Sequence, residues 1–392
     1  MNGAMALKSA FRTLTVVFVL MLALTAKVMA QSVLIPSPPQ IAGSSYVLMD
    51  PKSGRIIMDE NSHERLPPAS LTKMMTAYIV ERELDEGRIS MTDMVPISVN
   101  AWKTGGSRTF VREGTQVAVA DLLRGVIIQS GNDASVALAE FIAGSEQAFV
   151  DIMNQQAQLL GMKDTHFENA TGLPAPNHYS TAFDLAILAR AIINDYPENY
   201  SIYSEKHFTF NDIRQPNRNS LLWRDSSVDG LKTGHTDQAG YCLVASAKRE
   251  DTRFIAVVMG TNSTQARAQE IQKMLNYGFR YYDSERLFQA GQELIEAKVW
   301  GGEANQISVG LAEDVYVTIP RGSRDSLEST VDLDSVIKAP IKVGDELGRV
   351  KVSYNGDVLV DQPVLALTDV PEGGFFKRIW DAIKLFFIQL MP

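Results

Sequence analysis

A serine and a lysine three positions apart form the first group in this chain that could do chemistry. They stand in Ser70-Leu71-Thr72-Lys73, where a segment with helical apolar spacing begins. On a helix, residues i and i+3 share a face, with Cβ atoms about 5–6 Å apart. A serine hydroxyl needs a base, and a lysine in a cleft with little water can lose its proton and act as one. The pair could work without histidine, although S-x-x-K alone also occurs at exposed helix starts.

Two later groups could complete the same chemistry. Ser130-Gly131-Asn132 precedes a predicted helix at residues 133–142, where Ser and Asn also serve as ordinary helix caps. Lys232-Thr233-Gly234 leads into a β-rich segment and could equally be a solvated turn. The order favours a joint function: S-x-x-K, then S-x-N sixty residues later, then K-T-G about a hundred further on, is the triplet of penicillin-recognising serine acyl-transferases.

Three stretches make the chain similar to a known family. They are Pro68-Ala-Ser-Leu-Thr-Lys-Met-Met75, Gln129-Ser-Gly-Asn-Asp133 and Val228-Asp-Gly-Leu-Lys-Thr-Gly-His-Thr236. With them the chain resembles the low-molecular-mass penicillin-binding proteins, specifically the serine-type, peptidase S11-like D-alanyl-D-alanine carboxypeptidases. The resemblance covers essentially the whole chain. It implies a periplasmic enzyme on the bacterial inner membrane that removes the terminal D-alanine from peptidoglycan pentapeptide stems and is acylated and inhibited by β-lactams.

The resemblance and the chemistry together assign the reaction steps. Ser70 would attack the carbonyl of the penultimate D-alanine, and Lys73 would accept the Ser70 proton. Ser130 would relay a proton toward the leaving amine, while Asn132 would bind the peptide amide. Water would then hydrolyse the acyl-enzyme.

The remaining site residues would bind the substrate. Lys232 would supply positive charge near the substrate carboxylate, and Thr233 would hydrogen-bond it. Gly234 would leave room for an extended peptide at the strand edge. The backbone N–H groups of Ser70 and His235 would form the oxyanion hole.

Two arginines are further candidates for the carboxylate pocket. Arg218 precedes the Lys232 segment and Arg267 follows it. A guanidinium group matches a carboxylate with two parallel hydrogen bonds, and the family pattern places both residues near that pocket. The alternative is that both are ordinary surface arginines.

The order of elements predicts an α+β fold. Strand patterns come first and last and helical patterns in the middle, which is typical of helices packed against an antiparallel sheet. The last two strand patterns flank a charged turn at residues 248–252, so they are predicted to form a hairpin. The strand patterns lie at residues 46–50, 55–59, 241–246 and 254–259, and the helical ones at 70–80, 119–128, 133–142, 146–160, 182–193 and 266–282.

A change of pattern after residue 286 predicts a second, small all-β domain. Short strand runs occur at residues 315–319, 350–354 and 358–360, and the last two flank Asn355-Gly356, a strong hairpin signal. The predicted organisation is a signal peptide at residues 1–30, a DD-peptidase catalytic domain at 31–286, a β domain at 287–369 and an amphipathic anchoring helix at 370–392.

The N-terminal residues have the pattern of a secretory signal. Lys8 and Arg12 precede an apolar run at residues 14–24, and small residues follow up to Ala30. The run is too short for a comfortable membrane span. We expect cleavage after Ala30, and the alternative is an uncleaved N-terminal anchor.

The C-terminal residues 375–391 predict an amphipathic helix on a membrane surface. Phe375, Trp380 and Phe386 belong to a broad apolar side, and Lys377 and Lys384 lie on the opposite side with other charges. Such a helix lies in the bilayer interface. The alternative is a terminal helix packed on a domain surface or in an oligomer contact.

Composition excludes several other functions. The chain has 392 residues and a net charge of −9, so nucleic acid is a poor candidate partner. Its five histidines are scattered, and no metal or organic cofactor is implied. The single cysteine, Cys242, is predicted to be a small buried strand residue. The sequence leaves the oligomeric state open.

Two rival functions share some of these features. A serine β-lactamase has the same triplet but deacylates quickly, commonly through a Glu-activated water; Glu168 falls near the right distance from Ser130, although its neighbours do not match the E-x-x-x-N context. A non-catalytic β-lactam sensor or cell-wall scaffold is the other rival. A sensor would need a true transmembrane helix, and a scaffold would not need the complete triplet.

Overall fold

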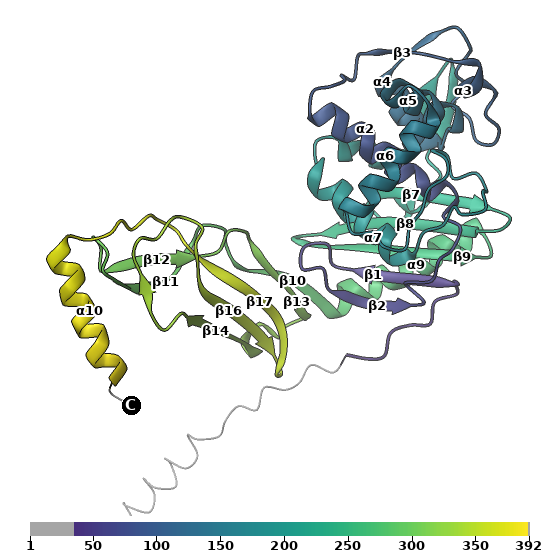
Figure 1. Cartoon of the computed structure of the whole chain (residues 1–392). Helices are drawn as coiled ribbons and strands as arrows, with labels where there is room; N and C mark the ends of the chain where they lie inside the picture. Colours follow the sequence, from purple (N-terminus) through teal and green to yellow (C-terminus); the bar gives the residue numbers. More distant parts are fainter. Residues whose placement is uncertain (1–34, 391–392) are drawn as a thin grey trace, which may run out of the picture.

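The computed structural model describes residues 35–390, and the predicted signal peptide lies outside this range. A larger domain of helices and sheet is followed by an all-β domain, and a final helix stands at its far end (Figure 1). The α+β class with an appended β domain is therefore confirmed.

A five-stranded antiparallel sheet forms the centre of the larger domain. Its strand order is β2-β1-β9-β8-β7, so the N-terminal strand pairs with one more than 190 residues later in the chain. Strand β7 occupies one edge. The strands are β1 (Ser45–Met49), β2 (Ile56–Glu60), β7 (Val228–Thr236), β8 (Gly240–Arg249) and β9 (Thr252–Thr261), with two small hairpins, β3 (Met94–Pro96) with β4 (Gln116–Ala118) and β5 (His207–Phe210) with β6 (Ile213–Pro216).

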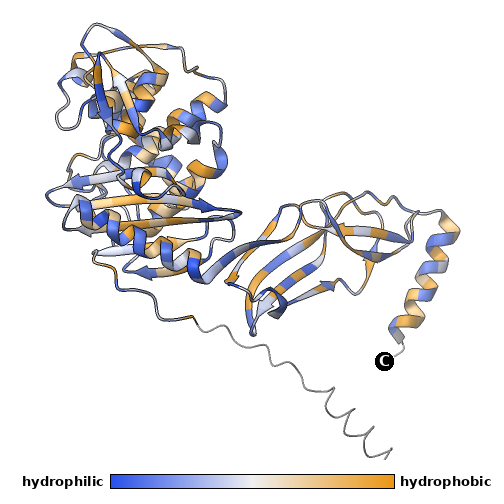
Figure 2. Cartoon of the chain, turned by 180° about the vertical axis from the view of Figure 1, so that it is seen from behind, coloured by the Kyte–Doolittle hydropathy of each residue, from blue (hydrophilic) through white to orange (hydrophobic). Residues whose placement is uncertain are grey.

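Helices cover both faces of this sheet, as Figure 2 shows. Along β9, Ile255 and Val257 face a core shared with the helices of the upper layer, whereas Phe254 and Ala256 face a second core beneath α9. Both faces of the strand are apolar because side chains alternate and both sides are buried. The helices are α2 (Lys73–Asp85), α3 (Val99–Lys103), α4 (Val119–Arg124), α5 (Asn132–Ala143), α6 (Glu146–Leu159), α7 (Ala182–Asp195), α8 (Leu221–Arg224) and α9 (Thr264–Tyr281).

The predicted helices are present, and two of them differ in a way that concerns the site. The nucleophile segment begins as a 3-10 turn, η1 (Ala69–Thr72), before α2. The segment predicted as one helix at 119–128 divides into α4 and a π-helical turn, η2 (Gly125–Gln129). A Cβ at residue 125 would overlap the side chain of Thr109, so glycine lets the two segments approach closely there. Cys242 is buried in β8, as predicted.

Strand β10 (Tyr282–Phe288) begins where α9 ends and crosses the predicted domain boundary at 287. It pairs with β13 (Val315–Pro320), so residues 282–286 belong with the β domain. No linker separates helix from strand, which is why composition does not mark the boundary. The other strands form a six-stranded sheet, ordered β14-β16-β17-β12-β11-β15. They are β11 (Glu293–Trp300), β12 (Gln306–Gly310), β14 (Leu327–Leu333), β15 (Ile337–Lys338), β16 (Glu346–Tyr354) and β17 (Asp357–Ala366).

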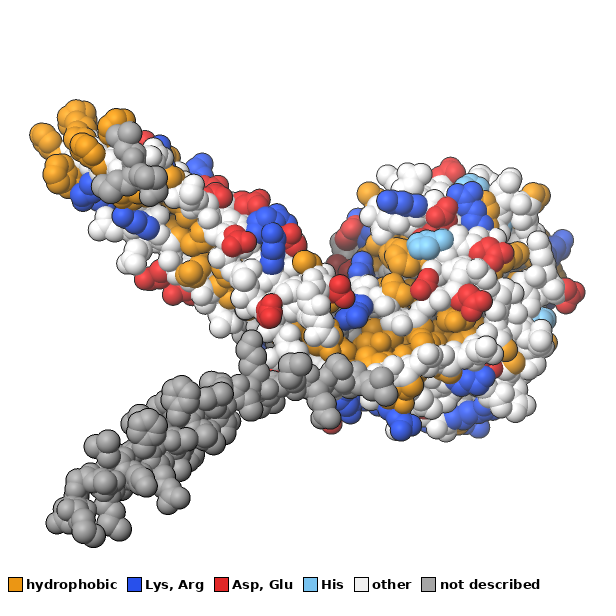
Figure 3. Space-filling view, turned by 90° about the horizontal axis from the view of Figure 1, so that it is seen from below, with side chains coloured by type: hydrophobic (Ala, Val, Ile, Leu, Met, Phe, Trp, Pro, Cys, Tyr) orange, Lys and Arg blue, Asp and Glu red, His pale blue; other side chains and the backbone are white. Residues whose placement is uncertain are grey.

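The final helix, α10 (Phe375–Leu390), attaches to the β domain by its polar side. Asp381 accepts a hydrogen bond from the Gly301 N–H at 3.1 Å, and Lys377 donates to the Gly302 carbonyl. The aromatic side chains point away, and Phe376 is 85% exposed. They form the orange cluster at the tip of the molecule in Figure 3. Within residues 35–390, no helix is long and apolar enough to cross a bilayer.

A buried carboxyl group on α2 predicts a pH-dependent stability. Glu81 is fully buried. Neither of its carboxyl oxygens makes a hydrogen bond of good geometry among residues 35–390, although the Tyr203 hydroxyl is close enough to oppose the pKa shift. Burial raises the pKa of Glu81 from 4.5 to about 8. The unfolded chain therefore releases this proton at lower pH than the folded protein, and stability is lost as the pH rises from 4.5 through 8. At pH 7 the loss amounts to about 3 kcal/mol.

We expect Glu81→Gln to raise the free energy of unfolding by about 2–3 kcal/mol at pH 7 and by little near pH 4.5. Urea denaturation across this pH range measures the difference. Glu83→Gln is the matched control, because hydrogen bonds from Arg88 lower the pKa of Glu83 and the substitution should destabilise the protein at pH 7. Equal stability of Glu81→Gln and the unmodified protein at pH 7 would show that Glu81 is charged in the folded state.

Candidate active site

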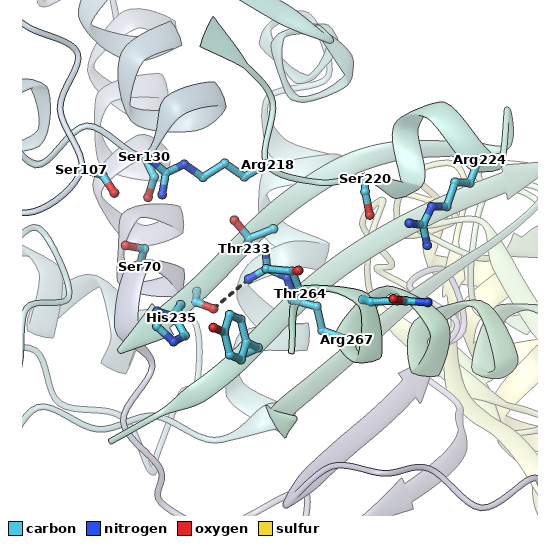
Figure 4. Close-up of a pocket in the computed structure, with 13 residues that line it drawn as sticks. Ser70, Ser107, Ser130, Arg218, Ser220, Arg224, Thr233, His235, Thr264 and Arg267 are labelled. Atoms are coloured by element: carbon cyan, nitrogen blue, oxygen red, sulfur yellow. Dashed lines mark hydrogen bonds between the residues drawn. The ribbon is translucent and has the colours of Figure 1, made fainter. Parts of the chain in front are cut away.

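The three sequence groups meet in one crevice of about 620 Å³ between the helical layer and the edge strand β7. Ser70 comes from η1, Ser130 from the end of η2, and Thr233 from β7 (Figure 4). The lining residues are Ser70, Ser107, Ser130, Arg218, Ser220, Arg224, Thr233, Gly234, His235, Tyr241, Thr264, Gln265 and Arg267.

Ser70 and Lys73 are in hydrogen-bond contact. Lys73 Nζ donates to Ser70 Oγ at 3.2 Å and also donates to the backbone carbonyl of Thr171. The lysine is fully buried, whereas the serine reaches the crevice. Ala69 has φ +48°, a left-handed conformation that costs a residue with a Cβ about 1 kcal/mol or more. The unusual backbone conformation is therefore at the residue directly before Ser70.

Lys73 is suited to be a base because its charged form is disfavoured. Burial, and after it the positive charge of Arg218, lower the pKa of Lys73 from 10.5 to about 7, while the charge of Asp133 opposes the change. Near pH 7, a substantial fraction of Lys73 is thus the neutral amine. A neutral amine 3.2 Å from a hydroxyl can take its proton.

Ser130 and Lys232 form the second contact. Lys232 Nζ donates to Ser130 Oγ at 2.9 Å. Since the lysine is the donor, the Ser130 proton remains available for a group in the crevice. Ser130 has φ +66° and is not a helix cap: the residue before α5 is Gly131. Burial, then the charges of Lys73, Arg218 and Arg267, lower the pKa of Lys232, so an anion bound in the crevice would favour its charged form.

The Lys232-Thr233-Gly234 group lies inside strand β7 and is not a solvated turn. Sequence reasoning connects Gly234 with room for a substrate, and the structure adds a packing reason. A Cβ at residue 234 would lie 3.0 Å from the Pro68 carbonyl oxygen and 3.1 Å from Leu71. Glycine thus lets β7 approach the turn that carries Ser70. The outer side of this edge strand is free to pair with an extended peptide.

Arg218 and Arg267 both line the crevice with Thr233, but Arg218 is exposed whereas Arg267 is buried. Arg267 is largely buried, and its guanidinium donates to the carbonyl of Gly234 at 3.1 Å. No carboxylate lines the crevice, although the whole chain is acidic. The arrangement favours a substrate with a carboxylate at this place.

Sequence reasoning missed the loop that closes the crevice on the helical side. Asp133 accepts hydrogen bonds from the backbone N–H groups of Thr109 and Phe110, both at 2.8 Å. Asn132, behind the lining, donates to the Gly105 carbonyl at 2.6 Å. These bonds fix the segment that carries Ser107. Asp133 directly follows the S-x-N group in the sequence, and this position is the sequence feature that could have pointed to its role in holding the loop.

A second loop positions Lys73. Thr72 and His178 share a hydrogen bond of 2.7 Å, and the Glu168 N–H donates to His178 Nδ1 at 3.1 Å. The imidazole thus ties this loop, which also supplies the Thr171 carbonyl, to the nucleophile segment. Glu168 accepts from the Asn177 N–H at 2.9 Å and does not line the crevice. Glu168 therefore does not occupy the position that a glutamate activating the deacylating water would need.

His235 and Tyr241 form the wall near Ser70. Their rings lie 4.0 Å apart, and Tyr241 was not predicted as a site residue. Within residues 35–390, no group of three or more His, Cys, Asp or Glu side chains is placed to hold a metal ion.

Two family models match the chain. One, described as D-alanyl-D-alanine carboxypeptidase, matches residues 32–263. The other, described as the C-terminal domain of penicillin-binding protein 5, matches residues 282–372. A curated relative, the D-alanyl-D-alanine carboxypeptidase DacA of Escherichia coli K12, is 44% identical over 362 residues, which is 90% of each chain.

Solved structures agree with these matches. Penicillin-binding protein 5 from Haemophilus influenzae is 45% identical, with a TM-score of 0.83 over 86% of this chain and all of that one. Penicillin-binding protein D2 from Listeria monocytogenes, solved in an ampicillin-bound form, is 28% identical, with a TM-score of 0.58 over 62% of this chain and all of that one.

Proposed function

Because the chain belongs to the D-alanyl-D-alanine carboxypeptidase family, we propose that its crevice releases the terminal D-alanine of peptidoglycan pentapeptide stems through an acyl-enzyme on Ser70. The observation that carries the proposal is the meeting of Ser70–Lys73 at 3.2 Å and Ser130–Lys232 at 2.9 Å in one crevice. Each serine is thus paired with an amine.

Acylation follows from these contacts. The neutral Lys73 amine takes the Ser70 proton as Ser70 Oγ attacks the carbonyl of the penultimate D-alanine. The backbone N–H groups of Ser70 and His235 stabilise the oxyanion, and losing one such donor typically costs about 3 kcal/mol. Ser130 gives its proton to the leaving nitrogen, and Lys232 holds its oxygen in place.

Substrate binding rests on the positive end of the crevice. Thr233, Arg218 and Arg267 hold the terminal carboxylate, and the bound carboxylate favours the charged form of the buried Lys232. Asn132 holds the Ser107 segment from behind the crevice lining, and β7 pairs with the extended peptide beside Gly234. Water then hydrolyses the ester on Ser70. β-Lactams react at the same serine, in keeping with the ampicillin-bound relative.

Release of D-alanine from a synthetic peptide that ends in D-Ala-D-Ala tests this function. A peptide that ends in D-Ala-L-Ala serves as the stereochemical control. We expect release from the first peptide alone. No release from it would contradict the proposed activity.

We also propose that the enzyme acts in the periplasm, exported by a cleaved signal peptide and attached to the inner membrane through residues 375–391. The exposed apolar side of α10 supports attachment: Phe375, Phe376 and Trp380 are 66%, 85% and 60% exposed. So large an aromatic surface is rarely left in water. The polar side of the helix is occupied by the β domain, which leaves the apolar side for lipid.

Truncation before Phe375 should release the protein into the soluble fraction with its activity on small peptides unchanged. The reason is that α10 makes none of the crevice. Sedimentation with membranes measures the change. A full-length variant with Phe376→Ser and Trp380→Ser is expected to behave similarly, since only the apolar surface differs. If the truncated chain still sediments with membranes, the attachment lies elsewhere.

A further inference from the structure

The crevice continues beyond the residues that the release of D-alanine requires. Ser220, Arg224, Thr264 and Gln265 line this extension. In Figure 4, Ser220 and Arg224 lie on the far side of Thr233 from Ser70 and Ser130. We call these four residues the distal end of the crevice.

The distal end carries a positive charge that the terminal carboxylate does not need. Arg218 and Arg267 already flank Thr233, and no carboxylate lines the crevice. Arg224 is exposed, and among residues 35–390 its guanidinium group has no partner in a hydrogen bond or ion pair. Its neighbour Asp225 is engaged by Arg249 at 3.0 Å and by Gln272. Arg224 is therefore a guanidinium with free donors at the end of a substrate crevice.

The backbone that carries Arg224 is firmly held. Arg224 ends the short helix α8, whose Leu221 and Leu222 are buried. Asn219, just before this helix, accepts from the Leu221 N–H at 3.1 Å and donates to the Gly230 carbonyl at 2.9 Å. Since Gly230 belongs to β7, these bonds fix α8 relative to the strand that binds the substrate.

The direction of the substrate follows from the proposed roles, on which this inference rests. Ser130 meets the leaving nitrogen, and the carboxylate of the leaving residue lies at Thr233 and Arg267. Ser220 and Arg224 lie on the far side of Thr233 from Ser70 and Ser130, so a side chain of the leaving residue that points away from Ser70 extends toward them. An alanine has only a methyl group as its side chain, which cannot accept a hydrogen bond from Arg224.

We propose that the distal end is a subsite for leaving residues larger than alanine that carry a second carboxylate, and that Arg224 binds this carboxylate. The substrate class is a peptide whose scissile D-alanyl amide joins an acidic D-amino acid with a free side-chain carboxylate. The bond changes are those of hydrolysis: the amide C–N bond breaks, the Ser70 ester forms, the amine receives a proton, and water cleaves the ester.

Four peptides that differ only in the leaving residue test the proposal: D-Ala, D-Gln, D-Glu and D-Lys. In the unmodified enzyme, we expect kcat/KM for D-Glu to exceed that for the isosteric D-Gln about tenfold, the size of one charge-assisted hydrogen bond, and D-Lys to be the poorest. Arg224→Gln should bring the D-Glu to D-Gln ratio to about one, and Arg224→Glu should favour D-Lys over D-Glu. Arg214→Gln, an exposed arginine outside the crevice, is the matched control and should keep the original ratio.

The outcomes separate the two proposals. If the unmodified enzyme releases no D-alanine, the proposed function fails. If it releases D-alanine but shows equal kcat/KM for D-Glu and D-Gln, or if Arg224→Glu keeps the original order, the subsite is refuted while the carboxypeptidase stands. Stoichiometric labelling by penicillin shows that each variant is folded.

Discussion

Ser70→Ala is expected to reduce D-alanine release by at least about 10⁴-fold and to abolish covalent labelling by penicillin, because no other hydroxyl in the crevice has a base beside it in the correct position. Ser130 also touches an amine, yet Lys232 is its donor and holds it where a leaving group would be. The loss should appear in kcat, since alanine leaves the carboxylate pocket intact.

Release of D-alanine and penicillin labelling, measured on the same preparation, test this expectation. Ser145→Ala is a suitable control: Ser145 caps α6 and does not line the crevice, so it should affect stability by about 1 kcal/mol and leave the rate alone. Substantial D-alanine release by Ser70→Ala would refute the acyl-enzyme mechanism.

Lys73→Met is expected to lower the acylation rate by about 10³-fold, within the range for removal of a general base. In the unmodified enzyme, the pKa of Lys73, about 7, also sets the pH dependence of acylation. The neutral amine is the reactive form, so the rate should rise with pH through about 7 and level off above it. The rise at this pH should be absent in Lys73→Met.

Lys73→Arg separates proton transfer from charge. Arginine keeps the positive charge but does not deprotonate in proteins. If Lys73 is the base, the arginine variant should be as slow as the methionine variant. Stopped-flow acylation by a chromogenic β-lactam gives both rates. A fast arginine variant, or a rate that falls as the pH rises through 7, would mean that Lys73 acts only by its charge.

Much of the site could be predicted from sequence because its chemistry lies in short contiguous stretches. Ser70 with Lys73, and Lys232 with Thr233, are neighbours in the chain, so spacing alone suggests how each group works. Arg218 and Arg267 have no such local pattern, and family resemblance alone pointed to them. The strands and helices were also predictable, since each buries an apolar face with its own period.

The parts that the sequence did not reveal depend on contacts between distant segments. Lys73 donates a hydrogen bond to the backbone carbonyl of Thr171. Every residue has such a carbonyl, so the sequence cannot show which one contacts Lys73. Gly234 is needed for packing against Pro68, which no local pattern indicates. The position of β1 between β2 and β9 likewise follows from the assembled sheet.

Arg224 illustrates the same limit. In the sequence it is one charged residue after an apolar stretch. Its place at the end of the crevice follows from α8, which Asn219 fixes to β7. The sequence alone cannot show that Arg224 belongs to the site, because the segments that form the crevice come together only in the folded protein.

Peptide mapping of the penicillin-treated protein tests the central claim most directly. Trypsin should release the peptide from Leu66 to Lys73, whose hydroxyl side chains are Ser70 and Thr72 alone. We predict that one penicillin adduct appears on this peptide, is located on Ser70 by fragmentation, and persists for minutes. An adduct on any other peptide, or hydrolysis of many penicillin molecules per second with no trapped adduct, would contradict the account.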